Sequence, residues 1–442
     1  MADRRSSGFR RNILLFRFEI LVAAVIPLML GAALALLDRG RGTLLAALYK
    51  WVTMSAGTDS WMPLNRAVEQ FNAGKAIYQP LFFQEHLKFQ YPPSSVIIFS
   101  YLKDLGITEP AVLNLLNWCL VAGNAVLVAI LGAAMARNSA KPAMRESPLL
   151  LGLLSLLVCL LSYPIMRAYA LGQAQVWINF LFAGACLCWY YGKKPIAGVA
   201  IGLICLIKPQ FGLFLVWALV ARQWQFILGW MAVFVPATII SLAKFGIGEH
   251  IAYLQVLSAL SKSGESYFAN QSLNGLLNRL LDNGPVLDWD GNAFPPVLPF
   301  VRWTTLLFSI LLVSAVLLRQ VNRRADLADF QLAALAFTMA SPIAWEHHYG
   351  ILPPIFLTSY FMLQAPESSR TLSRSSILLA LAFVLSEVSL GKWNGIAAAP
   401  WNLLYSYNFF GAALLAWILC SSGSSSVSRP AGDLTGSRSP AQ

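Results

Sequence analysis

The segment 341–350, "SPIAWEHHYG", places three ionisable side chains in a row between two strongly apolar stretches. They are Glu346, His347 and His348. The zinc-protease pattern H-E-x-x-H is absent, and neighbouring helical residues point about 100° apart, so the two histidines do not form a chelate by themselves. A metal would need a further ligand such as Asp59, and we expect none. An imidazole N–H suits a phosphate or another hydrogen-bonding group better, with Glu346 either orienting a histidine or tuning its charge.

Asp59 is the second side chain that could do chemistry. It lies in "TDSWMP", just before a segment that predicts a short amphipathic helix closed by Gly74. A helix of this kind would lie at a membrane surface. The carboxylate is therefore either a cap for the helix or a base that faces a substrate. Tyr91 follows in "FQYPPSSVIIF", where two prolines predict an extended lead into a short apolar element.

Lys208 lies in "IKPQ", between two short apolar runs that Pro209 separates. A lysine at the end of an apolar helix either extends its ammonium to the membrane interface or has an anionic partner. Gln173, in "GQAQ", lies beside a predicted helix start. Its amide could bond sugar hydroxyls, or it could equally bond a neighbouring helix.

The stretch 270–281, "NQSLNGLLNRLL", is polar and then apolar. It predicts an amphipathic helix that begins at Ser272. Asn274 and Arg279 lie on this helix, and we include both among the candidate substrate-binding residues. The acidic residues that follow lack the glycine and glutamate spacing of a calcium loop.

These polar residues stand out because the chain is mostly apolar. Of its 442 residues, 57% are hydrophobic and 12% charged, and the mean hydropathy is +0.61. Apolar runs long enough to span a bilayer recur throughout, which predicts an all-α, polytopic membrane protein rather than a β-barrel. The net charge of +12 is typical of basic cytoplasmic loops. No basic stretch carries interleaved aromatic residues, so we expect a lipid bilayer and no nucleic acid as partner.

About twelve apolar runs are candidate transmembrane helices. They are 17–38, 110–135, 147–166, 173–191, 195–208, 209–221, 224–244, 299–319, 328–345, 348–365, 375–392 and 401–420. The segment 92–106 is short, and charge decides its placement. If it does not cross, the basic clusters fall on the cytoplasmic side almost without exception. These clusters comprise Arg4, Arg5, Arg10, Arg11, Arg137, Lys141, Arg145, Lys193, Lys194, Arg222, Arg319, Arg323, Arg324, Arg370 and Arg374.

This topology leaves two large loops on the outer face, at about 39–109 and 245–298. The segment 92–106 is then re-entrant or lies along the membrane surface. The same charge count moves Asp59, Lys208 and the histidine pair to the outer face. We expect one membrane domain over residues 1–420 and a disordered cytoplasmic tail over 421–442, which is rich in Ser, Gly and Pro.

Seven short motifs, taken in order, resemble glycosyltransferase family 87. Each is weak alone, but the order is specific, and the resemblance covers about residues 15 to 420. The motifs are "TD", G-x-x-x-Y from Gly74 to Tyr78, F-x-YPP from Phe89 to Pro93, "GQ" at Gly172 and Gln173, G-x-x-x-x-x-KP from Gly202 to Pro209, "NQSLNG" and "SPIAWEHHY". The family contains polyprenyl-phosphate-sugar-dependent mannosyltransferases of the GT-C fold.

The resemblance implies sugar transfer on the outer face of a bacterial-type cytoplasmic (inner) membrane. The donor would be a sugar on a polyprenyl phosphate, most often mannose, and the acceptor a lipid or a glycan. The family's catalytic aspartate maps to Asp59. Its lysine and histidine positions map to Lys208, His347 and His348, which would hold the donor phosphate or the acceptor. No cofactor is implied.

The residue inventory agrees with this chemistry. Nucleotide sugars are cytoplasmic, so an outer-face transferase needs a lipid-linked donor. Its phosphate leaving group needs electrostatic stabilisation rather than a general acid. One carboxylate then suffices as the base, instead of the carboxylate pair of a glycosidase, and direct attack would invert the anomeric centre.

Two other functions remain open on the sequence. A lipid-linked sugar flippase or secondary transporter would suit broken helices and charges within the membrane, although the chain shows no internal repeat. An O-antigen-type polymerase or ligase would share the large outer loops but would use a diphosphate-linked donor.

Overall fold

The computed structural model describes residues 44–291, 293–364 and 374–421. These residues form helices joined by loops, and Asn270 and Trp345 form an isolated antiparallel bridge. The predicted all-α class is therefore confirmed for this part of the chain. The predicted first span at 17–38 and the predicted tail beyond residue 421 lie outside the described residues.

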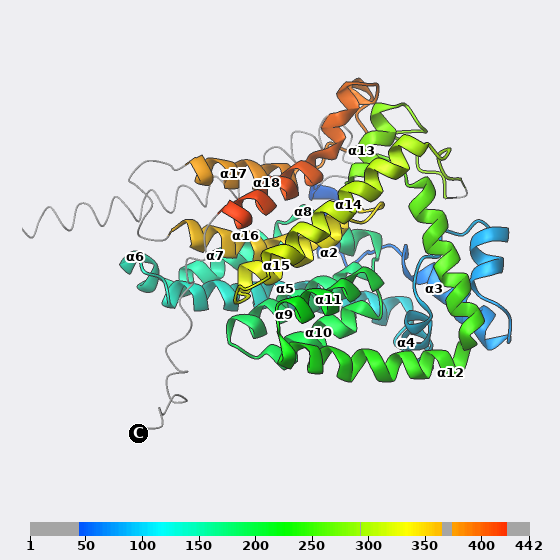
Figure 1. Cartoon of the computed structure of the whole chain (residues 1–442), viewed down its shortest axis with the longest axis horizontal. Coiled ribbons are helices and arrows are strands. Elements are labelled where there is room, and N and C mark those ends of the chain that lie inside the picture. Colours follow the sequence, from blue (N-terminus) through cyan, green and yellow to red (C-terminus); the bar gives the residue numbers. More distant parts are fainter. Residues whose placement is uncertain (1–43, 292, 365–373, 422–442) are drawn as a thin grey trace, which may run out of the picture.

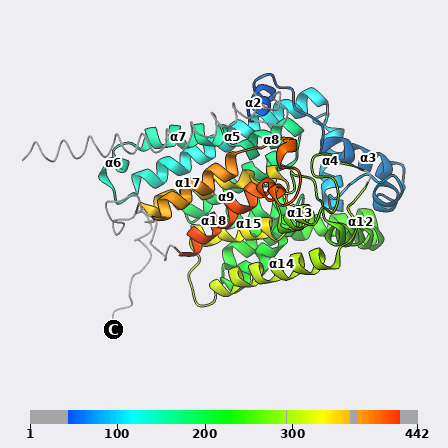
Figure 2. The same cartoon turned by 90° about the horizontal axis from the view of Figure 1, so that it is seen from above.

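Most helices run side by side in one bundle, and shorter elements gather at its two ends (Figure 1, Figure 2). The bundle contains α5 (Pro110–Arg137), α7 (Pro148–Leu160), α8 (Tyr163–Leu171), α9 (Gln175–Tyr190), α10 (Lys194–Cys205), α11 (Leu213–Val220), α12 (Trp224–Ser263), α14 (Pro299–Arg319), α15 (Leu327–Met339), α16 (Leu352–Leu363), α17 (Arg374–Glu387) and α18 (Tyr407–Ser421). The short elements are α2 (Leu44–Val52), α3 (Trp61–Asn72), the π-helical η1 (Gln79–Gln84), α4 (Pro93–Asp104), α6 (Pro142–Arg145), α13 (Leu273–Leu280) and the 3-10 turns η2 (Pro209–Gly212), η3 (Glu346–Ile351), η4 (Asn394–Ile396) and η5 (Trp401–Ser406).

Fewer helices than predicted are long enough to cross a membrane. By length and apolar composition, four described helical stretches qualify: α5, α12, α14 and the continuous stretch Trp401–Ser421. The pair α7 and α8, bent by 48°, would make a fifth. The 12 residues of α10 rise only about 18 Å, short of a hydrocarbon core of roughly 30 Å. The count of about twelve spans is thus not confirmed, because backbone breaks that hydropathy does not register interrupt several of the apolar runs.

The helix α14 faces outward along almost its whole length. Only 17% of its apolar window is buried, and its exposed side chains include Phe300, Trp303, Leu307 and Leu311. An apolar surface of this extent would be unfavourable in water. It is suited to the acyl chains of a bilayer, as expected for a membrane protein.

Two glycines let α10 and α12 pack closely. A Cβ atom on Gly198 would lie 2.1 Å from the carbonyl oxygen of Phe226, and one on Gly229 would lie 2.0 Å from that of Pro195. Small residues at a contact of this kind let two backbones approach, as is common between membrane helices. The contact ties α10, which leads to Lys208, to a long apolar helix.

The helix α12 consists of two halves separated at Gly246, whose φ of 72° and ψ of 171° are not helical. The first half runs along the bundle, and the second half turns and crosses its end (Figure 1). The prediction that the span 224–244 ends at this point is therefore confirmed. The second half covers the end of the bundle at which α3 and α4 lie.

The segment 92–106 contains the short apolar element that the sequence predicts, and its placement relative to a membrane stays a prediction. This segment forms α4, whose 12 residues are too short to cross a bilayer. The hydroxyls of Ser94 and Ser95 donate to the carbonyl oxygen of Leu206 at 2.8 and 2.9 Å. The ring of Phe99 stacks on Trp61 of α3 at 5.9 Å between centroids, so α4 joins the short elements to the bundle.

The two ends of the bundle differ in charge. One end carries α6, and the other carries α3, α4 and α13 (Figure 1). Basic residues lie where helices begin or end next to α6, namely Arg137 of α5, Arg145 of α6, Lys194 of α10 and Arg319 of α14. All four belong to the basic clusters predicted for one side of the membrane, although other helices also end in basic turns, at Lys50, Lys103, Lys262 and Arg279.

Candidate active site

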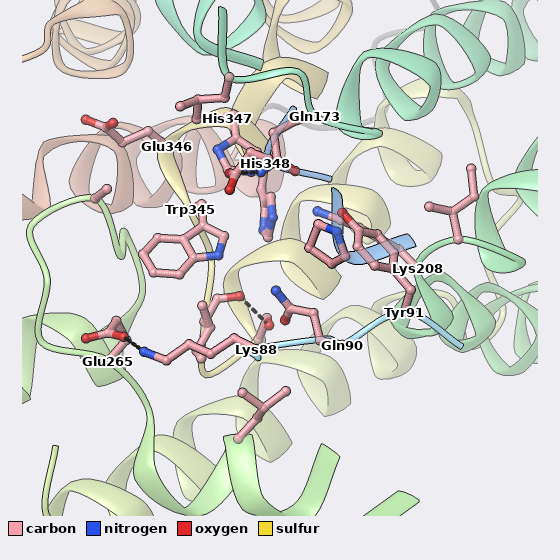
Figure 3. A pocket seen from close by; sticks show the side chains of 18 of the residues that line it. Lys88, Gln90, Tyr91, Gln173, Lys208, Glu265, Trp345, Glu346, His347 and His348 are labelled. Carbon is pink, nitrogen blue, oxygen red and sulfur yellow. Dashed lines mark hydrogen bonds and ion pairs between the residues drawn. The ribbon is translucent and has the colours of Figure 1, made fainter. Parts of the chain in front are cut away.

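A cavity of about 980 Å³ lies at the end of the bundle opposite α6. Four chain segments supply most of its polar wall: the loop before α3, the α8–α9 turn, the turn after α10 and the 3-10 turn η3. Figure 3 shows His347, His348, Gln173, Lys208 and Tyr91 on this wall. The structure therefore brings together residues that the sequence separates by almost 300 positions.

Asp59 is positioned by a backbone contact between two glycine-containing turns. The amide of Asp59 donates to the carbonyl oxygen of Leu171 at 3.0 Å, and the amide of Gly57 donates to that of Ala170 at 3.0 Å. Gly172 ends α8 with a φ of 71°, and a Cβ atom there would lie 1.8 Å from the carbonyl oxygen of Gly57. Only glycine allows this approach.

The carboxylate of Asp59 is exposed to the cavity and accepts a hydrogen bond from the Gln173 amide. The walls around it restrict its hydration, and this raises the pKa of the carboxyl above its usual value. The hydrogen bond from Gln173 and the charge of Arg167 oppose that shift. Asp59 is not the helix cap, because the N-cap of α3 is Ser60 and no side chain caps this helix.

Tyr91 and Ser60 hold Gln173 in place. The hydroxyls of Ser60 and Tyr91 lie 2.6 Å apart, and the Ser60 hydroxyl donates to Gln173 Oε1 at 2.8 Å. Oε1 is thereby occupied, which directs the amide nitrogen of Gln173 towards Asp59. Tyr91 lines the cavity, but its hydroxyl supports the base through two other side chains.

Lys208 lies just beyond the end of α10, where Pro209 begins η2 and breaks the helix as predicted. Its ammonium donates to Gln175 Oε1 at 2.6 Å. None of the ion pairs among the described residues includes Lys208. Burial therefore lowers the pKa of Lys208 below its usual value, and an anion in the cavity would supply the missing partner.

Glu346 pairs with Arg167, and its hydrogen bonds come from tyrosines rather than from a histidine. Its carboxylate accepts hydrogen bonds from the hydroxyls of Tyr163, at 3.1 Å, and Tyr407. Arg167 Nε lies 3.9 Å from Glu346 Oε2 and has no hydrogen-bond partner. Glu346 thus places the guanidinium of Arg167, a residue outside our predicted set, at the cavity wall.

The two histidines line the cavity with unpaired ring nitrogens. Their rings lie 4.8 Å apart, nearly perpendicular to each other. His347 Nε2 and His348 Nδ1 are buried and have no hydrogen-bond partner. Burial, with the nearby charges of Lys208 and Arg167, lowers the pKa of His347 well below its usual value. At neutral pH this imidazole is therefore uncharged and can donate one hydrogen bond.

Asn274 and Arg279 do not line the cavity. The helix α13 begins after Ser272, whose hydroxyl accepts from the amide of Gly275 at 3.1 Å, so the predicted helix start is confirmed. Arg279 is buried and donates to the carbonyl oxygens of Tyr267 and Asn270 at 3.2 and 3.0 Å. Both residues stand behind the cavity wall and support it.

The motif "NQSLNG" holds the motif "SPIAWEHHY" in place. The side chain of Asn270 accepts from the amide of Ala344 at 3.0 Å, and the amide of Gln271 donates to the carbonyl oxygen of Ala344 at 2.7 Å. The hydroxyl of Ser272 donates to the carbonyl oxygen of Pro342 at 2.8 Å. These bonds fix the backbone that carries the two histidines.

Besides Arg167, three residues of the wall were not among the site candidates predicted from the sequence: Lys88, Glu265 and Trp345. Lys88 and Glu265 form an ion pair at 2.9 Å although 177 residues separate them. Each lies in an irregular loop without a motif, so no periodicity indicates it. The sequence offered one indication of this pair: Lys88 and Glu265 carry opposite charges and lie in the two large loops that were predicted on the same side of the membrane.

The arrangement can hold an anion and accept a proton in one cavity. Among the described residues, no three His, Cys, Asp or Glu side chains gather in a group that could hold a metal ion. Asp59 offers a carboxylate, while Lys208, Arg167 and the histidines offer donors on the same wall. The carboxylate suits a hydroxyl nucleophile, whose proton it can accept, and the donors suit a phosphate leaving group, whose charge they can stabilise.

Comparison with known proteins places the chain in a family. The model of glycosyltransferase family 87 matches residues 89–342, a range that includes Tyr91, Gln173 and Lys208 but neither Asp59 nor the two histidines. No curated protein matches the sequence. Since the family model covers more than half of the 442 residues, the chain belongs to glycosyltransferase family 87.

Proposed function

We propose that this membrane glycosyltransferase moves a hexose, mannose in our assignment, from a polyprenyl-phosphate donor to a lipid or glycan acceptor. The observation that carries the proposal is the cavity shared by Asp59 and an unpaired cationic group, Lys208. Asp59 takes the proton of the acceptor hydroxyl. Lys208, Arg167 and the two histidines stabilise the departing phosphate.

The charges of the polar wall support a single-base reaction. Of the acidic side chains in the cavity, Glu346 pairs with Arg167 and Glu265 pairs with Lys88. Within the part of the chain that the structure describes, Asp59 has no ion pair and Lys208 has no carboxylate partner. A monophosphate leaves as a stable anion, so the site needs one base and no general acid. Direct attack by the acceptor inverts the anomeric carbon.

The size and lining of the cavity support a lipid-linked donor. About 980 Å³ lies near the upper end of the volumes typical of ligand sites. Apolar side chains lie beside the cationic wall, including Met62, Ile207, Leu213 and Phe337. They would contact the first isoprene units, while Lys208 meets the phosphate.

The distribution of charge supports action on the outer face. The predicted cytoplasmic residues Arg137, Arg145, Lys194 and Arg319 lie at the α6 end of the bundle, and the cavity lies at the opposite end. Loops rich in Lys and Arg stay in the cytoplasm. The site would then open away from the cytoplasm, on the outer face of a cytoplasmic membrane, where nucleotide sugars are absent and a lipid-linked donor is required.

The test is the variant Asp59→Asn in purified protein reconstituted into liposomes. We expect transfer from mannosyl polyprenyl phosphate to fall by about a thousandfold, the scale of a lost general base. The control Asp104→Asn changes an exposed carboxylate outside the cavity and should retain activity. Thermal unfolding of both variants should match that of the wild type.

Full activity of Asp59→Asn would contradict the assigned base. The same liposomes separate the alternative functions. Movement of the labelled lipid across the bilayer without a new glycosidic bond would favour a flippase or transporter. Activity with a diphosphate-linked donor, and none with a monophosphate, would favour a polymerase or ligase.

A further inference from the structure

The cavity has a second wall, which is aromatic and comes from the second outer loop and from the residue that precedes η3. Trp289, Phe294, Tyr267 and Trp345 line it. Trp289 exposes 47% of its surface, although a large aromatic side chain gains most when it is buried. In Figure 3 Lys88 and Glu265 lie away from His347 and Gln173, and Trp345 lies between the two groups.

Lys88 fixes the loop that carries Trp289. Its ammonium donates to Glu265 Oε2 at 2.9 Å and to the carbonyl oxygen of Asp290 at 2.8 Å. It also lies 4.3 Å from the ring centroid of Phe294 and 5.3 Å from that of Trp289, within cation–π range. One lysine of the first outer loop therefore holds the second outer loop against the cavity.

The ion pair of Lys88 and Glu265 is nearly buried, with side-chain exposures of 10% and 7%. Such a pair gains little net stability, because dehydration offsets the attraction between the charges. Both residues nevertheless line the cavity. A carboxylate and an ammonium beside an open space offer hydrogen-bond acceptors and donors to a polar ligand.

This combination fits a sugar better than it fits the donor's phosphate or its lipid chain. The C–H groups of a pyranose face pack on an indole ring, and its hydroxyls both donate and accept hydrogen bonds. A phosphate would be repelled by Glu265. An isoprene chain would bury the charged pair without offering it a hydrogen bond, which is costly.

We propose that Trp289, Lys88 and Glu265 form the subsite for a saccharide acceptor, across the cavity from the donor phosphate. Trp289 stacks on the sugar ring, Glu265 accepts hydrogen bonds from its hydroxyls, and Lys88 holds the Trp289 loop and the Glu265 carboxylate in place. This inference rests on the proposed function, in which Asp59 deprotonates a hydroxyl of the same acceptor. It limits the acceptor to molecules that present a sugar ring.

The test is saturation-transfer NMR on the full chain in lipid nanodiscs, which detects binding without turnover. The probes are the methyl glycosides of α-mannose, β-glucose and β-galactose, with farnesyl phosphate as a probe of the donor side. We expect ring C–H signals from at least one glycoside. They should fall about fivefold or more in Trp289→Ala and largely persist in Trp289→Phe, because the aromatic face is retained.

A matched control is Trp401→Ala, which removes a tryptophan that is 63% exposed but does not line the cavity. This variant should bind glycosides as the wild type does, and farnesyl phosphate should bind equally to all variants. The subsite is wrong if no glycoside gives ring signals, if Trp401→Ala loses them equally, or if Trp289→Ala loses farnesyl phosphate instead. Such a result would leave the Asp59→Asn test of the transferase reaction intact.

Discussion

Two cations near the cavity, the buried Arg279 and the half-buried Lys208, differ in how fully their hydrogen-bond donors are used. The terminal nitrogens of Arg279 donate to three backbone carbonyl oxygens and, at 2.6 Å, to the Ser406 hydroxyl. The ammonium of Lys208 has one partner, the side-chain oxygen of Gln175. A cation whose donors are used supports the fold, whereas one with donors to spare can meet a ligand.

The same contrast separates the other polar residues. The amide of Gln271 donates to the carbonyl oxygens of Phe268 and Tyr405, and its oxygen accepts from the amide of Asn408. Arg167 Nε and His347 Nε2 have no hydrogen-bond partner. Gln271 and its partners lie around α13, whereas Arg167 and His347 line the cavity. Arg279 Nε and Asn274 Nδ2 also lack a partner, so it is the position relative to the cavity, together with the number of satisfied donors, that divides candidates that look alike in sequence.

The largest effect should come from Arg279→Met. It leaves the carbonyl oxygens of Ser266 and Asn270 and the Ser406 hydroxyl without this donor, while the carbonyl oxygen of Tyr267 keeps the amide of Asn270, and each buried unsatisfied group costs roughly 1–3 kcal/mol. We expect the free energy of unfolding to fall by about 3 kcal/mol or more, measured by thermal unfolding in detergent. The control Arg66→Met removes an exposed arginine and should change little. If Arg279→Met lost activity at an unchanged unfolding temperature, Arg279 would bind substrate rather than support the fold.

The next effect should come from Lys208→Met. Loss of one preorganised cationic donor costs about a hundredfold or more in kcat/KM, measured with the lipid-linked donor. The unfolding temperature should stay constant or rise, because the buried ammonium has no anionic partner. The control Lys75→Met lies in an exposed turn. A loss of stability comparable to that of Arg279→Met would break the distinction between the two cations.

Local signals in the sequence predicted some elements well. Pro209 ends the α10 region, Ser272 caps α13, and Gly74, with a φ of 66°, follows α3. Each depends on backbone chemistry within a few residues. The all-α membrane class and the end of the apolar run just before Gly246 were predictable because they too depend on local composition and backbone chemistry.

Long-range pairing was not predictable. Asp59 and Gln173 are 114 residues apart, and Lys88 and Glu265 are 177 apart. No periodic pattern links either pair, because a loop contact depends on how the whole bundle places its ends. Arg279 was predicted to be a site residue for the same reason. Neither its residue type nor its motif indicates that its guanidinium donates to backbone carbonyl oxygens. The span count is not confirmed where apolar helices break, as between Met339 and Leu352.

A smaller effect should come from Gly172→Ala, which tests whether backbone contact positions the base. A Cβ atom at this φ of +71° would lie 1.8 Å from the carbonyl oxygen of Gly57, so the Asp59 loop must shift. A displacement of about 1 Å can cost roughly tenfold to a hundredfold in rate. Gly106→Ala is the matched control, since Gly106 also has a φ of +71° but has nothing within 4 Å of the added atom. Equal losses in both variants would mean that backbone strain alone is responsible.

The smallest effect concerns the pH dependence of transfer. Limited hydration raises the pKa of Asp59, and the hydrogen bond from Gln173 opposes that shift. A base must be ionised, so kcat should fall about tenfold per pH unit below the raised pKa, and this acid limb should lie above the pH expected for a free aspartate. Gln173→Leu removes the opposing hydrogen bond, so the acid limb should move to still higher pH. Gln210→Leu changes another amide that lines the cavity and should leave the limb in place. A limb that moves to lower pH in Gln173→Leu, or moves equally in both variants, would show that Asp59 is not the titrating base. The polar wall would then have to be assigned to binding alone.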